Sequence, residues 1–142
     1  MALSKVASGG ELSRAMLATR LVLSAAPPTL VFDEVDAGVG GEAALAVGRA
    51  LSALGSDHQV LVVTHLAQVA AFADQQVLVS KTEAGGRTVA QARPVAGNDR
   101  VVELSRMLSG HPDSAAARKH AKELLAMGAR SVTGSGRSGN LA

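Results

Sequence analysis

The 142-residue chain contains no cysteine, no tryptophan and no tyrosine, and it has only two phenylalanines. The absence of cysteine excludes disulfide bonds and thiolate-bound metal, and it is compatible with a reducing compartment. The scarcity of aromatic rings removes the stacking platforms on which many proteins bind single-stranded nucleic acids. These absences therefore disfavour a disulfide scaffold and a base-stacking surface.

Charge and long apolar runs are also scarce. Only 18% of the residues are charged and the formal net charge is +2, with the Lys and Arg residues scattered along the chain instead of forming a basic stripe. No stretch approaches the roughly 20 apolar residues that a membrane span requires, and the N-terminus lacks a signal-peptide pattern. Because 47% of the residues are hydrophobic, we expect one soluble, cytoplasmic domain without a membrane partner.

The first part of the chain predicts a helix followed by a buried strand. Ser8 and Glu11 form a Ser-x-x-Glu capping box, and a helix should run from there to about Ser24. An apolar stripe that includes Ala15 should bury one side of this helix. A Pro-Pro pair then ends it, and the short apolar run 29–32 is typical of a strand in a parallel sheet.

The remaining pattern predicts an α/β fold. The expected elements are a helix over 42–54, a strand over 59–63, a short helix over 67–72, a hairpin of 77–81 with 87–94, a helix capped by Asn98 and Asp99 that ends at 108, and a helix over 114–127. We therefore expect a mostly parallel sheet with flanking helices and an antiparallel hairpin at its edge. The domain should cover residues 1–127, and the Gly/Ser-rich tail 128–142 should be disordered.

The segment Ser8-Gly9-Gly10-Glu11 is a candidate phosphate site. Unpaired N–H groups and the positive end of the dipole attract anions to a helix N-terminus, and glycine lets a phosphate approach the backbone closely. The Ser8 hydroxyl can add a hydrogen bond to a terminal phosphate. Taken alone, the same four residues are more often an ordinary helix cap.

Three acids follow the first predicted strand directly. Asp33 and Glu34 stand where that strand ends, and Asp36 lies in the same turn. One carboxylate in such a place can hold Mg²⁺, and a second can orient or deprotonate an attacking water. The alternative is that these acids are structural, with Asp36 serving to start the next helix.

His65 comes directly after the second strand, in the run Val62-Val63-Thr64-His65. A parallel sheet would place it at the same edge as Asp33 and Glu34. There its imidazole could contact a terminal phosphate. A lone histidine in this position is more often structural, but the nearby acids favour the phosphate role.

A complete nucleotide site would also need a Gly-x-x-x-x-Gly-Lys-Ser/Thr loop, whose backbone cradles the phosphates. No Gly-Lys pair occurs anywhere in the 142 residues. The chain therefore carries at most half of such a site.

In order and type, these elements resemble those of the ABC-class ATPases. Residues 8–11 look like the signature motif, 29–34 like Walker B, Asp36 like the D-loop and His65 like the switch histidine. Glu11, where transporters typically carry glutamine, favours the SMC-like branch. Within that branch, the segments 5–14, 32–41, 63–70 and 100–108 are similar to the RecN family of bacterial DNA repair proteins.

The resemblance covers residues 3–127 and implies the C-terminal lobe of a P-loop ABC/SMC-type ATPase head. It implies ATP and Mg²⁺ as ligands, and a role in DNA double-strand-break repair and recombination at the nucleoid. Heads of this family sandwich two nucleotides between two copies. By this resemblance, Asp33 would bind Mg²⁺, Glu34 would activate the hydrolytic water and His65 would contact the γ-phosphate. Asp36 would communicate across the interface between heads. The nucleotide of the facing head would be bound by the signature residues Ser8, Gly9, Gly10 and Glu11.

Walker A, the glutamine loop and the coiled-coil arms of the family would precede Met1. We therefore expect a fragment that hydrolyses no ATP alone. Its expected partners are the N-terminal head lobe that carries Walker A, a second head in a homodimer, and DNA through the full-length protein. The alternatives are a non-catalytic module that docks on an ATPase head, and another SMC-like or ABC ATPase.

Overall fold

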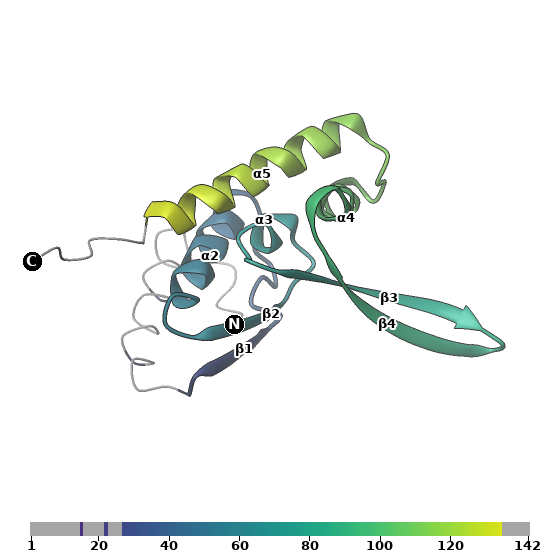
Figure 1. Cartoon of the computed structure of the whole chain (residues 1–142), viewed down its shortest axis with the longest axis horizontal. Helices are drawn as coiled ribbons and strands as arrows, with labels where there is room; N and C mark the ends of the chain where they lie inside the picture. Colours follow the sequence, from purple (N-terminus) through teal and green to yellow (C-terminus); the bar gives the residue numbers. More distant parts are fainter. Residues whose placement is uncertain (1–14, 16–21, 23–26, 135–142) are drawn as a thin grey trace, which may run out of the picture.

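The computed structural model describes Ala15, Val22 and residues 27–134, and it has the expected α/β architecture (Figure 1). The elements are β1 (Thr29–Asp33), α2 (Gly41–Leu54), β2 (Gln59–Val63), α3 (Ala67–Ala70), β3 (Gln76–Ala84), β4 (Arg87–Val95), α4 (Gly97–Ser109) and α5 (Ala115–Gly134). Ala15 and Val22 are helical and exposed, so the prediction of a buried stripe is wrong at Ala15.

β1 and β2 form a parallel pair in which Thr29 lies opposite Gln59 and Asp33 lies opposite Val63. Side chains alternate between the two faces of this pair. One face packs on α2, and its apolar cluster is formed by Ala44, Val47, Leu51, Leu54 and Val69 together with Phe32, Val60 and Val62. The opposite face is bare, because Val31, Leu61 and Val63 are half or more exposed. We call these three residues the open face.

The predicted hairpin is present, but it is not an edge of the parallel sheet. β3 and β4 pair with each other in a separate two-stranded sheet. The turn between them places Gly85 and Gly86 at φ values of 59° and 74°, which glycine adopts readily. α3 and the turn after it stand between β2 and β3, so the two strands are apart and the hairpin projects from the helices (Figure 1).

α4 and α5 cover α3 and complete the second apolar cluster. The buried members of this cluster are Ala67, Ala70, Ala71, Leu104, Ala121 and Leu124. α4 begins after Ala96 without a side-chain cap, so the prediction that Asn98 and Asp99 cap it is wrong. Asp99 instead pairs with Arg93 of the hairpin at 3.4 Å.

α5 continues beyond its predicted end at Met127 and reaches Gly134. The assignment of residues 128–134 to a disordered tail is therefore wrong, while 135–142 lie outside the described residues. Gly128 is an interior residue of α5. Glycine is needed there because its missing side chain lets α5 approach the backbone at Ala71. None of the helices in the described part is long and apolar enough to cross a membrane.

Candidate functional site

The parallel register of β1 and β2 brings the predicted site residues together. Asp33 is the last residue of β1 and lies opposite Val63, the last residue of β2. Glu34 and His65 therefore leave the sheet at the same edge, as the sequence predicted. The signature segment 8–11 lies outside the described residues, so its position relative to this edge stays a prediction.

Glu34 has a left-handed backbone with φ of 54°, and no other non-glycine residue in the described ranges has a positive φ. For an L-residue this conformation costs about 1–2 kcal/mol, and such residues cluster at functional sites. The turn that follows is held by two backbone hydrogen bonds, from Ala37 N–H to the Glu34 carbonyl and from Val39 N–H to the Asp36 carbonyl, each at 3.1 Å. The chain therefore reverses sharply, and the exposed Glu34 stands at the sheet edge.

Asp36 is the buried member of the acidic turn, with 1% of its surface exposed. Its Oδ2 accepts a hydrogen bond from the Thr64 hydroxyl. The same oxygen lies 3.7 Å from Nδ1 of His65, whose side chain is 76% exposed. The carboxylate is therefore directed into the gap between the two strand ends.

Thr64 is the residue of this site to which the sequence analysis gave no role. Its Oγ1 also accepts a hydrogen bond from the Leu66 N–H at 3.0 Å, which makes residues 64–66 a hydroxyl-stabilised turn. His65 lies at the apex of that turn. The available signal was a hydroxyl residue between the end of a buried strand and the candidate histidine.

The described residues contain no group of three or more His, Cys, Asp or Glu side chains that could hold a metal ion. Mg²⁺, however, is commonly bound through one or two carboxylates, with water and phosphate oxygens completing its coordination. The exposed carboxylate of Asp33 at the strand end fits the role of a single such ligand. The site therefore suits Mg²⁺ that arrives with a nucleotide better than Mg²⁺ held by protein alone.

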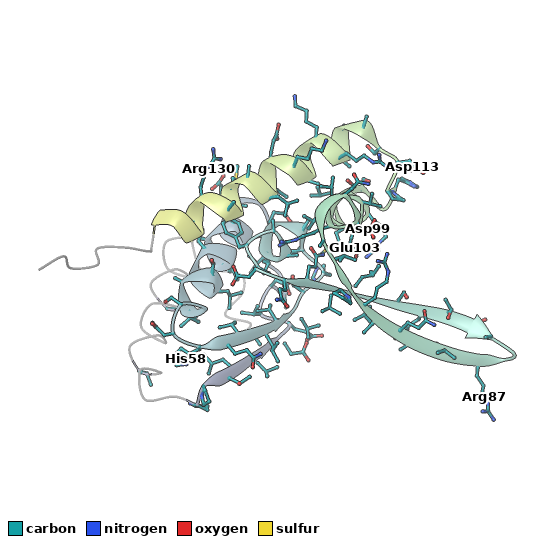
Figure 2. All side chains as sticks on the ribbon, in the orientation of Figure 1. His58, Arg87, Asp99, Glu103, Asp113 and Arg130 are labelled. Atoms are coloured by element: carbon teal, nitrogen blue, oxygen red, sulfur yellow. The ribbon has the colours of Figure 1, made fainter. Side chains whose placement is uncertain are left out.

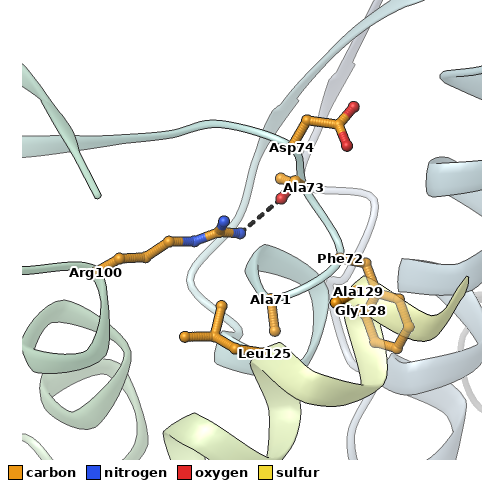
Figure 3. A pocket seen from close by; sticks show the side chains of 8 residues that line it. All are labelled: Ala71, Phe72, Ala73, Asp74, Arg100, Leu125, Gly128 and Ala129. Atoms are coloured by element: carbon orange, nitrogen blue, oxygen red, sulfur yellow. Dashed lines mark hydrogen bonds between the residues drawn. The ribbon is translucent and has the colours of Figure 1, made fainter. Parts of the chain in front are cut away.

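A cavity of about 320 Å³ lies away from this edge, between the end of α3, Arg100 of α4, and Leu125 and Gly128 of α5 (Figure 3). Arg100 donates from Nη2 to the carbonyls of Ala70 at 3.0 Å and Ala73 at 2.7 Å, and from Nε to Gln76 at 3.2 Å. Burial lowers the pKa of Arg100, and the charge of Asp74 partly opposes this shift. Because the guanidinium is occupied by the carbonyls at the end of α3, we assign it a structural role.

No protein-family model matches the chain. The chain is 57% identical over 125 residues to the DNA repair protein RecN of Streptomyces coelicolor. It is 58% identical over 124 residues to the RecN of Deinococcus radiodurans. Each alignment covers 87% of this chain and 22% of the relative. The RecN of Treponema pallidum is 51% identical over 134 residues, which are 93% of this chain and 23% of the relative.

The chain belongs to the RecN family. It spans about a fifth of the length of these RecN relatives. The resemblance inferred from the motifs is confirmed, while the individual roles of the site residues stay predictions.

The fold is similar to that of a solved structure described as "Structural biochemistry of ATP-driven dimerization and DNA stimulated activation of SMC ATPases". The TM-score is 0.54, and the match covers 73% of this chain and 63% of the other. At 17% identity the likeness concerns the fold alone. It confirms the expected SMC-type architecture for this RecN-family chain.

Proposed function

We propose that the chain forms part of the ATPase head of a RecN-like protein and contributes to ATP hydrolysis in DNA double-strand-break repair and recombination. The main support is that Asp33, Glu34 and His65 meet at one edge of the β1–β2 pair in a chain of the RecN family. Polar groups at the carboxyl edge of parallel strands are where α/β proteins commonly bind ligands. DNA would be reached through the whole protein.

In this proposal each residue of the edge has a separate task. Asp33 binds Mg²⁺, which when bound neutralises charge on the nucleotide phosphates. Glu34 orients the attacking water and accepts its proton, and the exposed ring of His65 contacts the γ-phosphate. In a homodimer of heads, the nucleotide of the facing head would be bound by Ser8, Gly9 and Gly10. Glu11 would cap the helix that follows them.

The burial of Asp36 refines the role that the motif pattern suggested for it. A side chain with 1% exposure does not reach a facing head directly. Asp36 would therefore act on the interface through the turn that it stabilises.

We further propose that a separate lobe, with the phosphate-cradling loop, docks against β1 and β2. The open face supports this, because three large apolar side chains, Val31, Leu61 and Val63, are 50–68% exposed on one two-stranded sheet. An exposed apolar face of this kind commonly marks an interaction site. Without that lobe the chain has no loop to bind the β-phosphate, so the chain alone should not hydrolyse ATP.

Reconstitution tests the proposal directly. The chain is co-expressed with the segment of the Streptomyces coelicolor RecN that precedes the matched region, and steady-state ATP hydrolysis is measured. We expect no turnover from the chain alone, turnover from the complex, and a loss of at least about 100-fold in the Glu34→Gln complex. Glu42→Gln, an exposed acid in the first turn of α2, is the matched control and should leave the rate unchanged. Equal rates for the Glu34→Gln and wild-type complexes would contradict the role of Glu34.

A second candidate is a non-catalytic module that docks on an ATPase head. The open face favours it as well, because docking requires the apolar surface and no catalytic residue. Stable association with the co-expressed segment, together with binding of ATP but no hydrolysis, would favour this function over the first.

A further inference from the structure

We propose that Asp36 and Thr64 are a positioning pair that fixes His65 relative to the acidic turn. This inference rests on the proposed function, because it gives His65 a task at the nucleotide. It concerns how the two strand ends are coupled, and it gives the hydroxyl of Thr64 the task of holding His65 in place.

The first support is the burial of Asp36. A carboxylate that is 1% exposed loses most of its hydration, and this loss must be offset by hydrogen bonds. The Thr64 hydroxyl donates to Asp36 Oδ2. Asp36 belongs to the turn after β1, whereas Thr64 follows β2, so the bond joins the two turns at the edge of the sheet.

The second support is that Thr64 is held from two sides. Its hydroxyl donates to Asp36, and the oxygen of the same hydroxyl accepts from the Leu66 N–H at 3.0 Å. Both bonds together select one side-chain rotamer of Thr64. Because His65 lies between Thr64 and Leu66, its backbone is fixed on both sides while its ring remains exposed.

The third support is the direction of the His65 ring. Nδ1 lies 3.7 Å from the same Asp36 oxygen that Thr64 contacts, which is too long for a hydrogen bond but favours a ring orientation with Nδ1 toward the protein. Nε2, on the other side of the ring, is then left for a phosphate oxygen. A hydrogen bond that served stability alone would not require the histidine to face this carboxylate.

Two variants of the full 142-residue chain separate positioning from stability. Thr64→Val removes the hydroxyl at nearly constant shape, and Thr64→Ser keeps the hydroxyl. Proton–carbon and proton–nitrogen NMR spectra report the ring resonances and the tautomer populations of His65, and the rings of His58, His111 and His120 serve as internal controls.

We expect Thr64→Val to shift the ring resonances of His65, to move its tautomer populations toward those of a free imidazole, and to leave the other three rings unchanged. Thr64→Ser should retain the wild-type pattern. Unchanged His65 resonances in Thr64→Val, or equal changes in both variants, would overturn the proposal. If Thr64→Val does not fold, Asp36→Asn gives the same test by removing the charge that faces Nδ1, with the same two outcomes.

The complex used for ATP hydrolysis adds a functional measurement. We expect Thr64→Val to lower kcat by about 10- to 100-fold with little change in KM for ATP, because misplacement of a group by about 1 Å can have such an effect. Thr64→Ser should restore kcat. A wild-type complex without turnover would reject the proposed function, whereas the NMR comparison would still decide whether Thr64 positions His65.

Discussion

Gly128 of α5 packs directly on the backbone of Ala71, so that a Cβ at position 128 would lie 2.2 Å from the Ala71 carbonyl oxygen. Gly48 of α2 meets the same region, since its Cβ would lie 2.5 Å from Cδ2 of Phe72. Two glycines on different helices therefore let α2 and α5 approach the end of α3.

Gly128→Ala should lower the free energy of unfolding by about 1–3 kcal/mol, because the added methyl overlaps backbone that cannot rotate away. Alanine has a better helix propensity than glycine by about 1 kcal/mol, so propensity alone predicts the opposite sign. Urea denaturation measures the difference. Ala126→Gly, at an exposed position of the same helix, calibrates the propensity effect. A Gly128→Ala variant that is more stable than wild type would contradict the close contact.

Arg100→Gln should lower the free energy of unfolding by about 1.5–3 kcal/mol, because it removes charged donors from the carbonyls of Ala70 and Ala73. Thermal and urea unfolding provide the measurement. Arg93→Gln is the control, since its ion pair with Asp99 has 59% and 64% exposed side chains and should contribute about 0–1 kcal/mol. Equal effects of the two substitutions would show that Arg100 does not hold the end of α3. Figure 2 shows the side chains of the hairpin and of α4, with Asp99 labelled.

Glu34→Gly should be more stable than Glu34→Gln by about 1 kcal/mol, since glycine adopts a positive φ without the Cβ clash and this gain exceeds its extra chain entropy. Both variants lose the same charge and the side chain is exposed, so the backbone conformation should dominate their difference in stability. Both should lack ATP turnover in the reconstituted complex. If Glu34→Gln were the more stable of the two, the left-handed backbone at this position would be in doubt.

Val31→Thr combined with Val63→Thr should weaken binding of the co-expressed lobe by about 10-fold or more, because both substitutions place a hydroxyl on the open face while keeping the β-branched shape. The stability of the isolated chain should change by less than about 1 kcal/mol, since both side chains are more than half exposed. Calorimetric titration measures the affinity. Val79→Thr, on the exposed hairpin, is the control and should leave binding unchanged; a loss equal to that of the double variant would contradict docking on the open face.

The sequence predicted most elements because their signals are local. The strand Gln59–Val63 is observed with its predicted bounds, and the Gly-Gly turn correctly predicted the pairing of β3 with β4. Two errors depended on distant partners. Gly128 resembles a helix end in the sequence, because its contact with the backbone of Ala71 cannot be read from neighbouring residues. The separation of the hairpin from the parallel sheet depends on the path of the chain through α3.

The candidate site was predictable in position but not in orientation. Residues that directly follow parallel strands must meet at one edge, so the proximity of Asp33, Glu34 and His65 follows from the strand order. The inward direction of Asp36 depends on a hydroxyl that comes from the other strand, and no local pattern specifies that bond. Thr64 had no predicted role, because its place between the strand end and His65 does not by itself show that its hydroxyl bonds Asp36.

The parallel pairing of β1 with β2 has a consequence for the order of folding. Thr29 must find Gln59, thirty residues away, whereas β3 and β4 are joined by a tight turn. Hairpins close within about 1–10 μs, and contacts between distant segments form later. In a refolding chain the hairpin of β3 and β4 should therefore be complete while the turns of Glu34 and His65 are still apart, so the candidate site would be among the last features to assemble.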